Sequence, residues 1–104
     1  MLDYSAPLRD MQFVLNELIG FEQICALPGT DDISLDLSNA VLEEASKFAK
    51  DVLAPLNRIG DLEGSRLDGD QVTTPTGWQE AYTAFKDSGW CSLAMSPQYG
   101  GCLL

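Results

Sequence analysis

The sequence predicts an all-α fold, an open bundle of three to four helices. Three stretches carry apolar residues at helical spacing, and loops rich in glycine, proline and acidic residues separate them. The chain has 104 residues, of which 45% are hydrophobic and 21% charged. This length and composition suit one small globular domain. A domain of this size buries a modest share of its surface, so we expect a thin core.

The first helix is predicted over residues 8–19, where apolar side chains cover a broad helical face. Pro7 suits its first turn, because the N–H group that proline lacks has no partner there. Gly20 is the expected end of this helix, and residues 21–27 are expected to add a further helical turn. Residues 28–32, Pro-Gly-Thr-Asp-Asp, predict a loop.

The second helix is predicted to begin at Ser34, whose hydroxyl can cap the first free N–H groups. Its charges suit the helix dipole, and Glu43 and Lys47 are expected to form an i,i+4 ion pair. Pro55 is expected to kink the helix or to end its regular part, with one more turn reaching Ile59. The face predicted to point inward consists of Leu37, Val41, Ala45, Phe48, Val52 and Leu56.

Residues 60–73 contain four acidic residues and three glycines, which predicts a solvated loop. Within it, Asp68-Gly69-Asp70 is typical of a turn that could close a short hairpin. Glu80 lies twelve residues after Asp68, the span of a calcium-binding loop. Apolar residues and a proline, however, fall where oxygen ligands should alternate. We therefore expect no metal site.

The third helix is predicted to begin near Thr74-Pro75, or at Thr76 with Gln79 completing a capping box. Gly89 is expected to end it in the left-handed conformation, followed by Trp90 as an apolar latch. The inward face is expected to carry Trp78, Ala81, Tyr82 and Phe85.

The end of the chain has two expected parts. Residues 91–95 are apolar and are expected to be extended, and residues 96–101 predict a turn-rich exit. The aromatic side chains around the third helix suggest a surface that continues beyond this chain.

The net charge of −10 and the lack of histidine limit the function. Six basic residues among sixteen acidic ones disfavour nucleic acid and anionic membranes as partners. Without histidine, Ser/His/Asp and Cys/His catalysis is excluded. The acidic residues of the second helix are best explained as a solvated face.

The cysteines and the N-terminus point to a soluble, cytoplasmic protein. Cys25, Cys91 and Cys102 form no CxxC pair, so zinc and redox motifs have no support, and reduced thiols are expected. A reactive Cys102 is the less favoured alternative to a small buried thiol. No signal peptide and no membrane span is predicted.

Four segments in order resemble the acyl-CoA dehydrogenase family. Residues 4–17, with a tyrosine, Ala-Pro and Asp-Met, resemble the N-terminal extension of one branch of this family. The other three segments are similar to the second helix and its exit, the third helix, and a Pro-x-Tyr-Gly-Gly turn. They are residues 42–61, 77–90 and 96–101. The resemblance divides the chain into an N-terminal extension with the first helix (residues 1–32) and a partial N-terminal helical domain (residues 33–104).

The resemblance implies the activity of a longer parent enzyme. Such an enzyme binds FAD, which accepts a hydride from the acyl β-carbon while a glutamate in the C-terminal part removes the α-proton. It thereby oxidises acyl-CoA to 2-enoyl-CoA, as in fatty acid β-oxidation. No catalytic, cofactor-binding or metal-binding residue of the family maps to a position here. We therefore expect this chain to be inactive and to bind neither FAD nor acyl-CoA.

The end of the chain departs from the family. After Gly101 the family usually continues with a polar residue, another glycine and an apolar-proline step, whereas Cys102-Leu103-Leu104 follows here. A truncated or frame-shifted product is the interpretation. Its expected partner is the rest of the parent enzyme, or a second copy bound through exposed helix faces.

Two other functions compete with this interpretation. One is a stand-alone acidic helical module that binds protein, for which the uncovered apolar faces are suited. The other is a small acyl carrier, which ranks last because the chain lacks a modifiable serine in an Asp-Ser-Leu setting.

Overall fold

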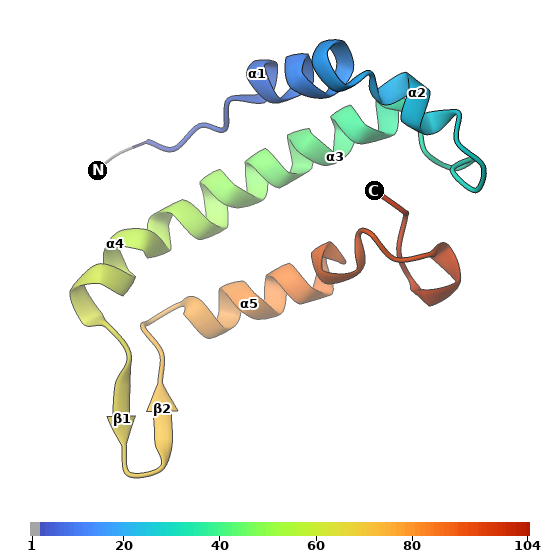
Figure 1. Cartoon of the computed structure of the whole chain (residues 1–104). Helices are drawn as coiled ribbons and strands as arrows, with labels where there is room; N and C mark the ends of the chain where they lie inside the picture. Colours follow the sequence, from blue (N-terminus) through green and yellow to red (C-terminus); the bar gives the residue numbers. More distant parts are fainter. Residues whose placement is uncertain (1–2) are drawn as a thin grey trace.

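The computed structural model describes residues 3–104, so the first two residues of the predicted extension lie outside it. One long helical rod, formed by α3 (Leu35–Phe48), η2 (Ala49–Leu53) and α4 (Ala54–Glu63), runs through the molecule. The N-terminal helices lie along one side of this rod, and α5 (Trp78–Asp87) lies along the other (Figure 1). The predicted all-α, open-bundle fold is confirmed, with one small hairpin added.

The molecule is a thin layer of helices. Its extents are 53 × 34 × 17 Å and its radius of gyration is 17.3 Å. A compact domain of this length has a radius of gyration of ~13 Å. A helix with its side chains is ~10–12 Å across, so the smallest extent leaves little room for a second layer. The chain therefore lacks the second layer against which a domain normally buries its apolar faces.

The N-terminal helices follow the prediction closely. The first helix consists of α1 (Leu8–Phe13) and the π-helical η1 (Val14–Ile19), and α2 (Phe21–Cys25) follows. Gly20 separates them with φ 76°, the left-handed conformation that glycine tolerates best. Pro7 stands just before the first turn, where its carbonyl accepts the Met11 N–H at 3.0 Å.

Helix α3 begins as predicted. The Ser34 hydroxyl accepts a hydrogen bond from the Leu37 N–H at 3.1 Å. Every residue of the predicted apolar face of this rod is partly shielded from solvent. The predicted Glu43–Lys47 ion pair is wrong: the Lys47 ammonium lies 2.7 Å from Glu44 Oε1. Side chains three apart on a helix meet as readily as those four apart.

The expected end of the helix near Ile59 is too early, because the rod continues past Pro55 to Glu63. The regular α-helix is interrupted before Pro55, as predicted, by the π-helical η2. Pro55 stands in the first turn of α4, directly after the π-helical η2. In this wider turn the Ala54 N–H bonds to the Ala49 carbonyl, five residues back. The backbone hydrogen bonds before Pro55 therefore already depart from the regular i→i−4 pattern. The N–H group that proline lacks does not end the helix at this position.

The predicted solvated loop over residues 60–73 is partly wrong. Residues 60–63 end α4, and strands β1 (Arg66–Asp68) and β2 (Gln71–Thr73) form an antiparallel hairpin. Its two-residue loop begins with Gly69 at φ 64°, as a tight hairpin turn requires. The turn at Asp68-Gly69-Asp70 is thus confirmed.

Helix α5 begins later than predicted. Gly77 precedes it in the left-handed conformation, and neither threonine caps it. The Thr76 N–H donates to a carboxylate oxygen of Glu63 at 2.8 Å, and the Thr76 hydroxyl caps no N–H group of α5. The predicted left-handed end at Gly89 is confirmed, with φ 84°.

The last residues form a closed loop. The expected extended segment over residues 91–95 is wrong, because η3 (Trp90–Ser92) is a 3-10 turn and Leu93 is helical. The turn-rich exit is confirmed by η4 (Pro97–Tyr99). Backbone hydrogen bonds return from residues 101–104 to residues 93–96. A Cβ on Gly101 would overlap the Met95 carbonyl, so only glycine fits this closure.

The core is as thin as the sequence predicts. Among the apolar residues of 3–104, Phe21, Ile33 and Ala81 fall in the buried class with 8–9% exposure, and no large side chain is fully buried. The packing that exists lies between the rod and its two neighbours.

Candidate functional site

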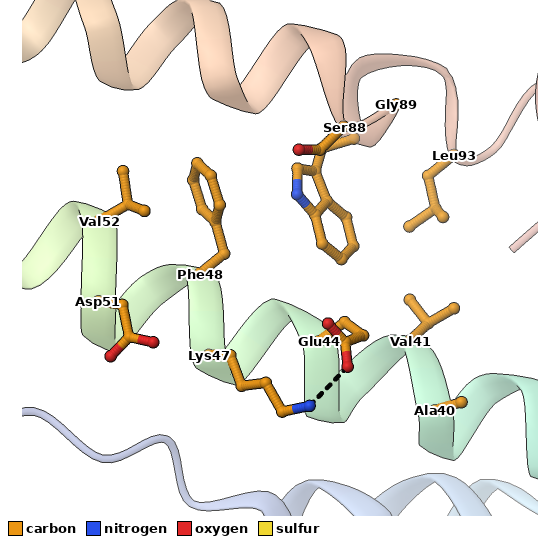
Figure 2. Close-up of a pocket in the computed structure, with 11 residues that line it drawn as sticks. Ala40, Val41, Glu44, Lys47, Phe48, Asp51, Val52, Ser88, Gly89 and Leu93 are labelled. Atoms are coloured by element: carbon orange, nitrogen blue, oxygen red, sulfur yellow. Dashed lines mark hydrogen bonds and ion pairs between the residues drawn. The ribbon is translucent and has the colours of Figure 1, made fainter.

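The candidate site is an open groove between α3 and α5 with a volume of about 520 Å³. The inward face of the rod forms one wall of the groove. The end of α5 and the turn that follows it form the other wall. Figure 2 shows Val41 and Leu93 pointing towards one another and Phe48 pointing towards α5. Its lining residues are Ala40, Val41, Glu44, Lys47, Phe48, Asp51, Val52, Ser88, Gly89, Trp90 and Leu93.

Aromatic packing holds this groove together. The Phe48 ring lies 6.0 Å from the Phe85 ring and 6.5 Å from the Trp90 ring, measured between centroids, with tilted planes in both pairs. Tilted arrangements at this separation are favourable because ring edges meet ring faces. The predicted inward face of α5 is therefore confirmed in part: Phe85 packs against the rod and Ala81 is buried, whereas Trp78 and Tyr82 are 44% and 63% exposed. Trp90 acts as the predicted latch.

The groove also contains a polar group without a partner. Trp90 Nε1 is buried, and no residue of 3–104 accepts a hydrogen bond from it. Buried indole N–H groups normally find an acceptor. This wall of the groove therefore offers one donor to whatever covers it.

Charged side chains lie along the rod side of the groove. Glu44 and Lys47 form the ion pair drawn in Figure 2, and Asp51 lies one turn further along. The hydrogen bond from Lys47 to Glu44, together with the charge of that carboxylate, raises the pKa of the Lys47 ammonium. Solvent screens this exposed pair, so it contributes little to stability.

A second polar contact ties the rod to α5. The Thr76 N–H donates to Glu63 Oε2 at 2.8 Å, and this backbone donor holds the pKa of the Glu63 carboxyl below its usual range. The Trp78 indole donates to the Leu56 carbonyl at 3.4 Å across the same junction. A hydrogen bond from a backbone N–H to a carboxylate was not evident from the sequence, because the two residues are thirteen positions apart.

The groove has no catalytic constellation. Its lining contains no cysteine and no histidine, and its carboxylates face solvent rather than a buried reacting centre. Among residues 3–104, no group of three or more metal-ligating side chains comes together. The expectation that this chain carries no catalytic, cofactor or metal residue remains a prediction for the protein as a whole.

The lining of this groove does not fit FAD. The flavin ring needs an enclosed pocket, and its pyrophosphate needs cationic or N–H donors. This groove is open, and two carboxylates flank its one ammonium group. No step of flavin chemistry follows from these residues.

The three cysteines are free thiols. Cys91 is exposed, whereas Cys25 and Cys102 are half-buried. The Cys102 thiol donates to the Leu93 carbonyl at 3.5 Å. Its place inside the closed terminal loop favours a packing role over the reactive alternative.

No family model matches the chain. Three curated proteins are similar to it over nearly its whole length. The 3-methylmercaptopropionyl-CoA dehydrogenase of Ruegeria pomeroyi is 41% identical over 100 residues, which are 96% of this chain and 17% of that protein. The butyryl-CoA dehydrogenase of Syntrophomonas wolfei is 26% identical over 93% of this chain and 16% of its own length.

The third relative is the broad-specificity linear acyl-CoA dehydrogenase FadE5 of Mycobacterium tuberculosis. It is 24% identical over 97% of this chain and 17% of its own length. All three relatives are acyl-CoA dehydrogenases by name. The chain is related in sequence to acyl-CoA dehydrogenases, as its four segments predict, and it spans about one sixth of the length of these relatives.

None of the helices within residues 3–104 combines the length and the apolar character required to cross a lipid bilayer.

Proposed function

We propose that this chain is the N-terminal helical segment of an FAD-dependent acyl-CoA dehydrogenase and that its role there is structural. The observation that carries the proposal is the 41% identity to one such enzyme over 96% of the chain. The open, single-layer architecture supports it, because the apolar faces need a further layer to cover them.

The chemistry of such an enzyme belongs to other parts of the polypeptide. Oxidation of an acyl-CoA needs a base within hydrogen-bond reach of the α-carbon and a flavin against the β-carbon. Neither requirement is met by the groove. We infer that the 104-residue chain alone has no dehydrogenase activity and does not bind FAD or acyl-CoA.

Partners and location follow from the same proposal. The rest of the enzyme is the favoured partner, ahead of a second copy of this chain. The cytoplasm is the proposed location. A stand-alone acidic interaction module remains the alternative, and the experiment below distinguishes the two.

A segment exchange tests the proposal. This chain replaces the matching segment of the Ruegeria pomeroyi enzyme, and the purified chimera is assayed for bound flavin and for oxidation of 3-methylmercaptopropionyl-CoA with an artificial electron acceptor. We expect flavin content within about twofold of the parent enzyme and activity within about tenfold. The isolated 104-residue chain serves as the second sample and should show neither.

Two outcomes would contradict the proposal. A chimera without flavin, beside an active control chimera carrying the Syntrophomonas wolfei segment, would favour the stand-alone module. Turnover by the isolated chain would refute the structural role.

A further inference from the structure

At one end of the layer α4, the hairpin and the start of α5 meet (Figure 1). Exposed apolar side chains at this end, and on the adjoining η2 and N-terminal segment, form one surface. Five exposed side chains mark it, and we call it the end surface. They are Tyr4, Leu53, Val72, Trp78 and Tyr82.

The continuity of the end surface follows from shared lining residues. One hollow connects Val72 of the hairpin with Trp78 and Tyr82 of α5. A second hollow connects Trp78 and Tyr82 with Leu53 of the rod. A third connects Leu53 with Tyr4 of the N-terminal segment. Each hollow shares at least one side chain with the next, so the three form one surface rather than scattered apolar residues.

The hairpin adds a pair of exposed apolar side chains to this surface. Leu67 and Val72 stand directly opposite one another in the register, so both point to the same face of the hairpin. Their exposures are 71% and 67%. A two-stranded hairpin is only marginally stable in water without packing on one face. Leu67 and Val72 form an apolar face that residues 3–104 leave uncovered.

Charge argues against a second copy as the cover. Each chain carries a net charge of −10, so two copies repel one another. The same charge disfavours an anionic membrane surface. In the three relatives, by contrast, more than four fifths of the polypeptide lies outside the matching stretch. That portion is long enough to supply a second layer.

We propose that the end surface, including the apolar face of the hairpin, is the docking site for the remainder of the same acyl-CoA dehydrogenase polypeptide. The inference rests on the proposed function and deepens it by assigning the interdomain contact to these residues. It also assigns a role to the hairpin, whose apolar face contacts the second layer.

Neighbouring residues of β2 provide a matched test. Val72 belongs to the apolar face and lines the first hollow, whereas Gln71 points to the opposite face of the same strand and lies outside that hollow. Val72→Asn and Gln71→Asn are compared in the isolated chain and in the Ruegeria pomeroyi chimera. In the isolated chain both variants should change the melting temperature by about 1 °C or less, because both sites are exposed. In the chimera Val72→Asn should lower it by about 3 °C or more, and Gln71→Asn should leave it within about 1 °C.

A second measurement avoids substitutions altogether. Hydroxyl-radical oxidation of Trp78 and Tyr82 is compared between the isolated chain and the unsubstituted chimera. We expect about fivefold slower oxidation in the chimera.

The outcomes separate the two proposals. An inactive chimera refutes the proposed function, and the docking inference falls with it. An active chimera in which both variants behave alike and both aromatic residues oxidise at the isolated-chain rate refutes the docking inference alone. A dimeric isolated chain in which Tyr82 is protected would assign the surface to a second copy and would also overturn the inference.

Discussion

The α3–α5 pair and the hairpin show two ways in which apolar residues are used in this chain. In the pair, the Phe48 ring packs against both Phe85 and Trp90, so the helices cover part of each other's apolar surface. In the hairpin, Leu67 and Val72 pair across the strands but remain largely exposed. The first region therefore contains aromatic packing within these residues, whereas the second presents an apolar face outwards.

The two regions therefore differ in how much they contribute to the stability of the isolated chain. Burial of apolar area stabilises the α3–α5 pair in the isolated chain, whereas the hairpin gains little from its exposed pair. Substitutions should therefore have large effects in the first region and small effects in the second, as long as no further partner is present.

Removing the central ring of the pair should have the largest effect. Phe48→Ala removes the side chain that both other rings contact. We expect it to destabilise the isolated chain by about 2–3 kcal/mol. This cost is small for the truncation of an aromatic residue, because Phe48 is only half-buried. Leu67→Ala is the matched control and should cost less than about 0.5 kcal/mol. Urea unfolding followed by circular dichroism measures both, and equal costs would contradict the comparison.

The junction between the two regions should give an intermediate effect with an unexpected sign. Alanine favours a helix over glycine by about 1 kcal/mol, yet a Cβ on Gly60 would overlap Cζ2 of the Trp78 ring. We expect Gly60→Ala to destabilise the chain by about 1–2 kcal/mol, because overlap outweighs propensity. In a Trp78→Ala background the same substitution should stabilise it by up to about 1 kcal/mol. A double-mutant cycle by urea unfolding tests this, and a stabilising Gly60→Ala in the native background would refute it.

The start of α3 should show a smaller effect. Ser34→Ala removes the hydroxyl that accepts from the Leu37 N–H, and losing such a cap costs about 1 kcal/mol. Ser34→Asp is the control, since aspartate caps equally well and its charge suits a helix start. The same unfolding assay should rank the native chain and Ser34→Asp above Ser34→Ala.

The smallest effect should be a pH dependence at the base of the hairpin. The pKa of Glu63 is lower in the folded chain, so its contribution is complete above the unfolded pKa and is lost as pH falls through the folded pKa. Glu63→Gln should lower the unfolding midpoint slightly at pH 7, and the difference from the native chain should shrink as the pH falls through the folded pKa of Glu63. Glu80→Gln serves as a control on an exposed site. A pH-independent difference between the native chain and Glu63→Gln would contradict this account.

Local signals in the sequence predicted the helical rod and its ends well. Ser34, Gly20 and Gly89 act through backbone conformation or a contact three residues away, which a single sequence displays. The apolar face of the rod was predicted for the same reason, since period alone defines it.

The errors have different causes. The π-helical turn before Pro55 is a local feature, but residue type alone does not specify it. The hydrogen bond from the Thr76 N–H to Glu63 joins residues thirteen positions apart, so no local pattern predicts it. The groove was only half predicted: the apolar face of the rod was identified, but the contact with the residues after α5 requires the hairpin that brings α5 back along the rod.

The thinness of the layer has a consequence for synthesis on the ribosome. The Ruegeria pomeroyi relative is about 590 residues long, since 100 matched residues make up 17% of its length. In the proposed N-terminal position of a protein of that length, about 490 residues follow this segment, and translation at ~5–20 residues per second takes ~25–100 s to add them. In the proposed arrangement the end surface emerges well before the sequence that covers it. We therefore expect a nascent chain with this layer to bind chaperones that shield apolar surface.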